Sequence, residues 1–232
     1  MSTIYLVRHG QAGTRDDYDR LSDLGHQQAR LLAEYFDAQK IRFDRVISGS
    51  LNRQRQTAEA VSEFYEVDAN WDEFDLTRVY CEIAPQLCAN DAVFARLYDE
   101  LKEQMRTSAG SSSATIHREW HPCDSMVVQA WMSGRYQQAG ETWQQFHDRI
   151  AACLTKLREL PDNQQVAIFT SATPIGIWGG LALDVFDQRS LRLAGVVHNS
   201  SYTVFKLRGA NLRLFTFNAT PHLADADMRT HR

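Results

Sequence analysis

The chain has 232 residues, of which 44% are hydrophobic and 23% charged, and its formal net charge at pH 7 is −4. This composition is typical of a globular protein with a sizeable core, and the length suits one large domain or two small ones. The acidic balance provides no general attraction to nucleic acid or to an anionic membrane, although it allows a local basic pocket for a small anion.

The apolar segments of the chain are too short for a membrane helix, which needs about 20 apolar residues. The sequence starts without the basic and apolar segments of a secretory leader. Four cysteines are scattered without CxxC spacing: Cys81, Cys88, Cys123 and Cys153. Together these features predict reduced thiols and a cytoplasmic protein.

Two short runs near the start of the chain, one apolar and one that reads Arg-Val-Ile, predict strands. Residues 4–7 form the first run, which breaks directly into the polar segment at residues 8–11. Ser22 then stands where it can cap a helix of about four turns. Residues 45–47 form the second run, and the pattern after it predicts a helix over about residues 51–64. The expected order is therefore strand, helix, strand, helix.

The middle of the chain differs from the rest. Residues 75–138 contain helical patches that are interrupted by a serine-rich segment at residues 108–113, which is typical of a surface loop. We interpret residues 75–138 as a helical cap inserted over the strand ends, and not as a separate domain.

The last part of the chain returns to alternating helices and strands. Residues 141–157 give the clearest amphipathic helix, and residues 166–169 predict a third buried strand. Residues 202–207 and 212–217 flank a turn and predict a hairpin. The whole pattern predicts an α/β fold, a three-layer sandwich with a mainly parallel central sheet, in a single domain over residues 1–232.

The end of the first predicted strand supplies two of the groups that phosphoryl transfer needs, Arg8 and His9. The reaction requires a nucleophile, positive donors for the phosphoryl oxygens and a proton for the leaving oxygen. A neutral histidine nitrogen can attack phosphorus, and the planar fork of arginine donates two hydrogen bonds to phosphate. Gly10 is expected to allow a close backbone approach, with free amides in the turn as further donors.

A second arginine follows another strand end, in the segment SGSLNRQRQTA at residues 48–58. Arg53 is expected just inside a helix whose N-terminus also favours an anion. Arg55 is expected on a solvated helix face. Because neighbouring parallel strands end at one edge of a sheet, Arg8 and Arg53 are predicted to converge on one phosphate.

These segments resemble the histidine phosphatase superfamily, in its phosphoglycerate-mutase-like branch. The resemblance rests on LVRHGQ at residues 6–11, LSDLG at residues 21–25 and RQRQTA at residues 53–58. Weaker matches are GETW at residues 140–143, Asn199, Ser201 and NATPHL at residues 218–223. An RHG triplet alone is a weak signal, but its position and the RxRQTA segment at the expected interval make the pair specific.

The resemblance implies that His9 is the residue that becomes phosphorylated. It also implies that Arg8 and Arg53 bind the phosphate, and we add Gln11 of the RHGQ segment to the predicted phosphate-binding set. The implied reaction uses no metal and no organic cofactor, and its substrate is a small phosphorylated molecule.

The general acid of the family is a glutamate after the second helix, in a hydrophobic-x-Glu pattern. The segment at residues 71–73 fits this pattern, and the resemblance therefore assigns the acid to Glu73, with Asp72 and Asp75 as competitors. A carboxyl group that donates to the leaving oxygen must first be protonated, and once ionised it can activate water.

The chain departs from the family at Ser171. The family usually has a second histidine after the third core strand, and Ser171 stands in that place. Its hydroxyl can still donate to a phosphate oxygen, so Ser171 joins the predicted phosphate-binding residues. A charged hydrogen bond contributes about 1.5–3 kcal/mol and a neutral one about 0.5–1.5. Loss of the charge would slow turnover by roughly one to two powers of ten. His198 and His222 are candidates to fill the space.

One further cluster suggests a metal site, because His117 and His121 have helical i, i+4 spacing and Cys123 follows. Glu119 lies midway between the two histidines instead of directly after the first, so the segment is not an HExxH motif. We therefore predict no metal site.

The predicted function is hydrolysis of a phosphate monoester through a phosphohistidine on His9. Mutase-type phosphotransfer is the first alternative, but the extended stretch that mutases carry after the acid is not recognisable in residues 74–80. The second alternative is a catalytically weakened phospholigand-binding protein, which Ser171 supports. No nucleic-acid or membrane partner is expected.

Overall fold

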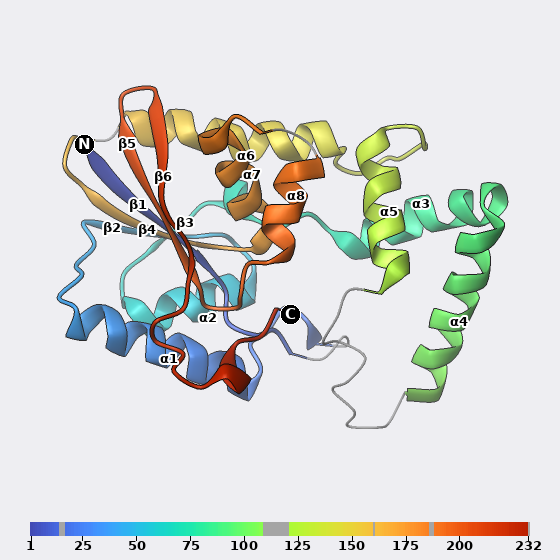
Figure 1. The fold of residues 1–232 in the computed structure, drawn as a ribbon, viewed down its shortest axis with the longest axis horizontal. Helices are drawn as coiled ribbons and strands as arrows, with labels where there is room; N and C mark the ends of the chain where they lie inside the picture. The colour runs from blue at the N-terminus through green and yellow to red at the C-terminus, as the bar shows by residue number, and fades with distance from the viewer. Residues whose placement is uncertain (14–16, 109–120, 160, 186–187, 232) are drawn as a thin grey trace. The chain divides into compact units, whose positions relative to one another are not determined.

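The computed structural model describes residues 1–13, 17–108, 121–159, 161–185 and 188–231 (Figure 1). The described chain forms two compact units. We call residues 1–73 with 149–232 the core unit and residues 74–148 the inserted unit. The serine-rich segment predicted as a loop lies almost wholly outside the described residues.

The core unit is built on a six-stranded sheet with the strand order β3-β2-β4-β1-β5-β6. Its strands are β1 (Ser2–Arg8), β2 (Arg45–Ser48), β3 (Glu66–Val67), β4 (Gln165–Thr170), β5 (Tyr202–Arg208) and β6 (Asn211–Ala219). Strands β3, β2, β4 and β1 pair in parallel, whereas β5 and β6 form the antiparallel hairpin. The predicted mainly parallel sheet and the hairpin are both confirmed.

Helices cover both faces of this sheet. Helices α1 (Asp23–Ala38) and α2 (Asn52–Val61) lie on one face, and α7 (Ala172–Leu183), α8 (Gln188–Gly195) and the second part of α6 (Trp143–Arg158) lie on the other (Figure 1). Two 3-10 turns, Ala69–Trp71 and Ala226–Met228, complete the core unit. The predicted three-layer α/β sandwich is therefore confirmed.

The sheet forms where the sequence is apolar because its strands are buried. Ile4, Ile168 and Phe205 are fully buried. On the α1 side, Phe36 packs edge-on against Tyr5 with ring centroids 6.0 Å apart. On the opposite side, Trp178 of α7 packs against Phe205 at 5.6 Å. Burial on both faces leaves the strand ends as the place where polar side chains collect.

Helix boundaries follow local capping. Ser22 caps α1 as predicted, because its side chain accepts a hydrogen bond from the amide of Gly25. Helix α2 ends three residues earlier than predicted, because Ser62 adopts an extended conformation and closes the helix with a backbone bond to Ala58.

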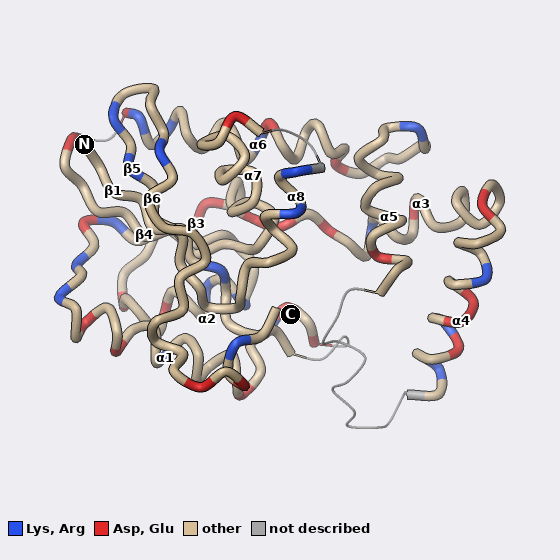
Figure 2. The backbone as a smooth tube through the Cα atoms, viewed as in Figure 1, with Lys and Arg blue, Asp and Glu red and all other residues tan. Residues whose placement is uncertain are grey.

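The inserted unit contains α3 (Leu76–Asn90), α4 (Ala92–Ser108), α5 (Pro122–Ser133) and the start of α6. Its aromatic core gathers around Trp131, whose ring lies 4.7 Å from that of Phe74 and 5.6 Å from that of Trp143. Charges of both signs alternate along α4 (Figure 2), where Lys102 pairs with Asp99 at 2.6 Å. That the inserted unit is a cap over the strand ends stays a prediction.

Candidate active site

His9 follows β1 and is held by its backbone on two sides. Its amide donates to the carbonyl of Thr170 at the end of β4 over 2.9 Å. Its carbonyl accepts from the amide of Ser200 at 3.1 Å and from the side-chain amide of Asn199 at 3.2 Å. The His9 side chain, which is only 2% exposed, is thus fixed at the junction of three chain segments.

The hydrogen bonds of the His9 ring define its tautomer. Nδ1 lies 2.7 Å from the carbonyl oxygen of Gly10, which can only accept, so Nδ1 carries the proton. Nε2 is then unprotonated, and its lone pair accepts a hydrogen bond from Nε–H of Arg53 at 3.3 Å. Burial is the largest cause that lowers the pKa of His9 well below 6.5, and the positive charges of Arg53 and Arg8 lower it further. The hydrogen bond to Gly10 raises this pKa, but by less. At neutral pH the ring is therefore neutral, which is the form a nucleophile needs.

The turn after His9 packs tightly against α1 and α2. A Cβ on Gly10 would lie 2.5 Å from the carbonyl oxygen of Gly25, so the close approach expected at Gly10 is made to α1. The amide of Gly10 donates to Thr57 at 3.0 Å, and that of Gln11 donates to Gln28 at 2.7 Å. The prediction that these amides are free donors is wrong, because polar side chains of the two helices satisfy them.

Arg53 is buried beside His9 and carries two further contacts. Its Nη1 pairs with Oδ1 of Asp19 at 2.9 Å, and the Tyr18 ring lies 5.0 Å from its guanidinium carbon. The structure thus brings Arg53 into contact with His9, the candidate nucleophile. The segment at residues 48–58 predicts Arg53 at this edge of the sheet. Arg55, two residues further along α2, is exposed and contacts the hydroxyl of Tyr65 instead.

Arg8 and Gln11 have protein partners in the described chain. Nη1 of Arg8 donates to the carbonyl oxygen of Val197, and the Arg8 side chain is buried. The side-chain oxygen of Gln11 accepts from the hydroxyl of Ser22 at 2.8 Å. Arg8 is close enough to His9 to lower the pKa of that ring. Gln11 is instead held by Ser22 at the start of α1.

Ser171 directly precedes α7 and is 1% exposed. Its hydroxyl does not cap the helix, and it accepts a hydrogen bond from the side-chain amide of Gln54 at 2.9 Å. Gln54 is the neighbour of Arg53, and Thr170 holds the amide of His9. Ser171 is therefore positioned from both sides at the same strand ends as His9.

Glu73 lies at the same end of the core unit, because its Oε2 accepts from the amide of Thr173 in the first turn of α7 at 3.1 Å. Its two competitors have other partners. Asp72 accepts from the amide of Ser50 at 2.6 Å, and Asp75 caps α3.

A family model for the histidine phosphatase superfamily (branch 1) matches residues 4–81 and 75–220. The chain belongs to the histidine phosphatase superfamily. The probable phosphoglycerate mutase GpmB of Escherichia coli is 26% identical over 205 residues, which cover 83% of this chain and 81% of that protein. The resemblance to this superfamily that the sequence motifs indicate is thus confirmed.

Solved structures of this superfamily share the fold. A phosphoserine phosphatase variant from Entamoeba histolytica, in complex with phosphoserine, is 18% identical with a TM-score of 0.59 and covers 96% of this chain and 100% of its own. A mycobacterial glucosyl-3-phosphoglycerate phosphatase with inorganic phosphate is 19% identical with a TM-score of 0.62 and covers 96% and 99%. At these identities the likeness establishes the fold alone.

Histidines other than His9 lie near this candidate site. The ring of His198 packs on that of His231 at 4.1 Å, and burial is the main cause that lowers the pKa of each. His222 instead lies 2.8 Å from the hydroxyl of Ser200 through its Nε2. The described contacts place neither His198 nor His222 against His9, and no local sequence pattern indicates a role for His231.

His222 is expected to make the protein sensitive to acid. Burial lowers the pKa of this ring to about 4, and its buried Nδ1 has no hydrogen-bond partner among the described residues. The unfolded chain takes up the proton near pH 6.5, so stability is lost as pH falls from about 6.5 to about 4. The loss amounts to about 3 kcal/mol. His222→Gln should reduce the fall in unfolding free energy between pH 7 and pH 4 by that amount, measured by urea titration.

The exposed His26 provides the matched control. His26→Gln should keep the pH dependence of the wild type. An equal fall in the wild type and in His222→Gln would show that His222 does not titrate with folding.

The metal cluster considered in the sequence is only partly described. His117 lies outside the described residues. His121 accepts from the amide of Cys123 at 3.2 Å and caps α5. Burial raises the pKa of Cys123 to about 11, so the thiol is protonated at neutral pH. Among the residues that the structure describes, no group of three or more metal-binding side chains occurs.

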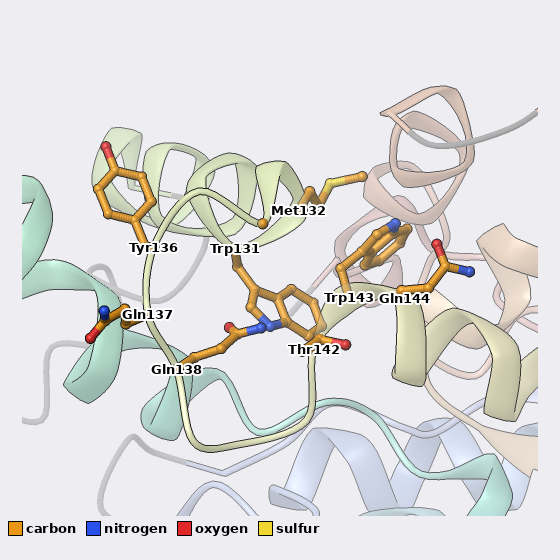
Figure 3. Close-up of a pocket in the computed structure, with 9 residues that line it drawn as sticks. Trp131, Met132, Tyr136, Gln137, Gln138, Thr142, Trp143 and Gln144 are labelled. Atoms are coloured by element: carbon orange, nitrogen blue, oxygen red, sulfur yellow. The ribbon is translucent and has the colours of Figure 1, made fainter.

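The inserted unit has a pocket of its own, of about 360 Å³ (Figure 3). It is lined by Trp131, Met132, Gly134, Tyr136, Gln137, Gln138, Thr142, Trp143 and Gln144. Trp131 donates its indole N–H to the carbonyl of Glu141 at 3.0 Å, so this polar atom is already satisfied. The lining has no charged side chain and therefore lacks the positive charge that favours a phosphate group.

Proposed function

We propose that this histidine phosphatase hydrolyses a phosphate monoester through a phosphohistidine on His9, without a metal. The proposal rests above all on the His9 ring, which is buried, neutral and fixed in one tautomer, with Nε of Arg53 lying 3.3 Å from Nε2. An unprotonated imidazole nitrogen that accepts a hydrogen bond from a guanidinium combines a nucleophile with a phosphate ligand, and the guanidinium is expected to turn to the phosphoryl group when substrate binds. Superfamily membership supports the same chemistry.

In the first step Nε2 of His9 attacks phosphorus, and the bond from phosphorus to the ester oxygen breaks. The electron pair of that bond stays on the leaving oxygen, which takes a proton from the carboxyl group of Glu73. Arg53 and Arg8 offset the charge on the phosphoryl oxygens, and the Ser171 hydroxyl donates to one of them.

In the second step water attacks the phosphohistidine. The ionised Glu73 accepts a proton from that water, the bond between nitrogen and phosphorus breaks, and His9 regains its neutral ring. Inorganic phosphate leaves, and the carboxyl group of Glu73 is again protonated. Nδ1 keeps its proton throughout because its bond to the Gly10 carbonyl persists.

The contacts of the three candidate acids favour Glu73. A carboxyl group at the start of α7 shares this edge of the sheet with Ser171, whereas Asp72 is engaged by Ser50. Gln11 is the weakest member of the predicted set, since its side-chain oxygen already accepts from Ser22.

The substrate that fits this proposal is a small phosphorylated molecule. Phosphoserine phosphatase from Entamoeba histolytica has been solved in complex with phosphoserine and with 3-phosphoglyceric acid. We place the protein in the cytoplasm, because the four cysteines are all free thiols. Within the described residues no helix is long and apolar enough to span a membrane.

The test is hydrolysis of p-nitrophenyl phosphate between acid and neutral pH in the presence of EDTA. We expect turnover that EDTA does not reduce, and after a rapid quench at alkaline pH a protein mass increased by one phosphoryl group. Turnover that EDTA abolishes would contradict the metal-independent mechanism. Phosphate binding without any turnover or phosphoprotein would favour the phospholigand-binding alternative that Ser171 supports.

A further inference from the structure

The buried guanidinium of Arg53 is already paired with a carboxylate. Nη1 of Arg53 lies 2.9 Å from Oδ1 of Asp19, and the two side chains are 8% and 45% exposed. Asp19 therefore reaches from the loop before α1 to the arginine that we assign to phosphate, while one side of its carboxylate stays in contact with solvent.

The second oxygen of the same carboxylate contacts the start of α2. Oδ2 of Asp19 accepts from the amide of Asn52, the first residue of that helix, at 3.2 Å. The preceding residue, Leu51, has no side chain that could cap the helix. Asp19 thus supplies the acceptor that the helix lacks, from a position 33 residues earlier in the chain.

The donors that Asp19 uses are those that bind oxyanions in proteins. A guanidinium and a helix N-terminal amide both favour a negatively charged oxygen. Tyr18 lies over the guanidinium at 5.0 Å and restricts its other side. Nε of Arg53 is directed at His9. A phosphoryl group that approaches Nε2 of His9 therefore meets an arginine whose charge Asp19 has neutralised.

We propose that Asp19 is an internal anion that holds the Arg53 and α2 donors and competes with the phosphoryl group of the substrate for them. It sets the affinity of the site, because a bound phosphate must either displace this carboxylate or lie beside its negative charge. The inference rests on the proposed role of Arg53 in phosphate binding. Asp19 is a specificity-determining residue and takes no part in bond making.

The experiment is calorimetric titration of the full chain with inorganic phosphate at neutral pH. Asp19→Asn keeps the size of the side chain and its acceptor oxygen but removes the charge. We expect Asp19→Asn to bind phosphate about 5- to 10-fold more tightly than the wild type, the effect of removing a neighbouring charge that solvent partly screens. Its KM for p-nitrophenyl phosphate should fall in the same proportion.

Asp17→Asn is the matched control, since Asp17 lies in the same loop and pairs with the exposed Arg20 at 3.6 Å. Its phosphate affinity should equal that of the wild type. Equal phosphate binding by Asp19→Asn would overturn the inference, and weaker binding would overturn it and show that Asp19 positions Arg53 instead. Urea unfolding of each variant confirms that the fold is intact.

A third variant separates this inference from the proposed function. If Arg53→Gln loses phosphate binding while Asp19→Asn behaves as the wild type, only the competition by Asp19 is overturned. If Arg53→Gln binds phosphate as well as the wild type, the assignment of Arg53 to phosphate is wrong, and the inference about Asp19 is overturned with it. Absence of phosphate binding in all four proteins overturns both.

Discussion

The His9→Asn variant is expected to lose turnover of p-nitrophenyl phosphate by at least about 10⁴-fold, as other enzymes do without their nucleophile. Asparagine is chosen because its side-chain N–H can replace Nδ1 as the donor to the Gly10 carbonyl. It has no basic nitrogen in the place of Nε2, so no phosphorylated intermediate forms. Steady-state kinetics and the mass of the quenched protein are the measurements.

His26→Asn is the control for this experiment, because His26 is exposed on α1. It should keep wild-type kinetics. The His9→Asn protein should retain phosphate binding, since Arg53 does not depend on the histidine for its position beside Asp19. Turnover by His9→Asn within tenfold of the wild type would show that another group attacks phosphorus.

The sequence was sufficient to predict the strands whose ends carry the candidate site residues. Residues 4–7 and 166–169 are continuous apolar runs and residues 45–47 end in two apolar residues, and such segments are buried strands when helices cover both faces of a sheet. Parallel strands deliver their last residues to one edge, and for this reason His9 and Ser171 meet there. The two motifs at residues 6–11 and 53–58 then identified the superfamily.

The partners of the site residues were beyond prediction from one sequence. Asp19 is an acidic residue in a polar loop, and no local pattern indicates that it reaches Arg53. Arg8 was predicted on phosphate alone, but it donates to the carbonyl of Val197, which is 189 residues away. Such contacts depend on tertiary packing, whereas periodicity and capping report only on neighbours along the chain.

The partners of the backbone amides after His9 were also beyond prediction from the sequence. The RHG segment suggested free donors, yet Thr57 and Gln28 use side chains to satisfy the amides of Gly10 and Gln11. Buried amides are almost always paired, and the sequence cannot say whether the partner is a ligand or the protein. The side-chain oxygen of Gln11 likewise has a partner within the protein, Ser22. Its role in phosphate binding stays a prediction.

The arginine beside the nucleophile gives the second large effect. Arg53→Gln is expected to lower kcat/KM for p-nitrophenyl phosphate by about 10²–10³-fold, which is the usual result of removing a charged donor from a transition state. Glutamine keeps a polar side chain at a position that is 7% exposed, so the fold should persist. The loss should appear in both KM and kcat, because Arg53 is expected to bind the phosphoryl group of the substrate and to offset the charge that is redistributed in the transition state.

Arg55→Gln separates this effect from a general loss of positive charge on α2. Arg55 lies two residues further along the same helix, is exposed, and directs its Nε at the Tyr65 hydroxyl over 3.4 Å. Since it faces away from His9, its removal should change kcat/KM by less than about threefold, as a screened surface charge does. Equal losses in the two variants would mean that the helix acts through its overall field. A large loss confined to Arg53→Gln would instead trace the effect to the contacts of Arg53 itself, with the phosphoryl group or with His9, because the two substitutions remove the same charge from the same helix.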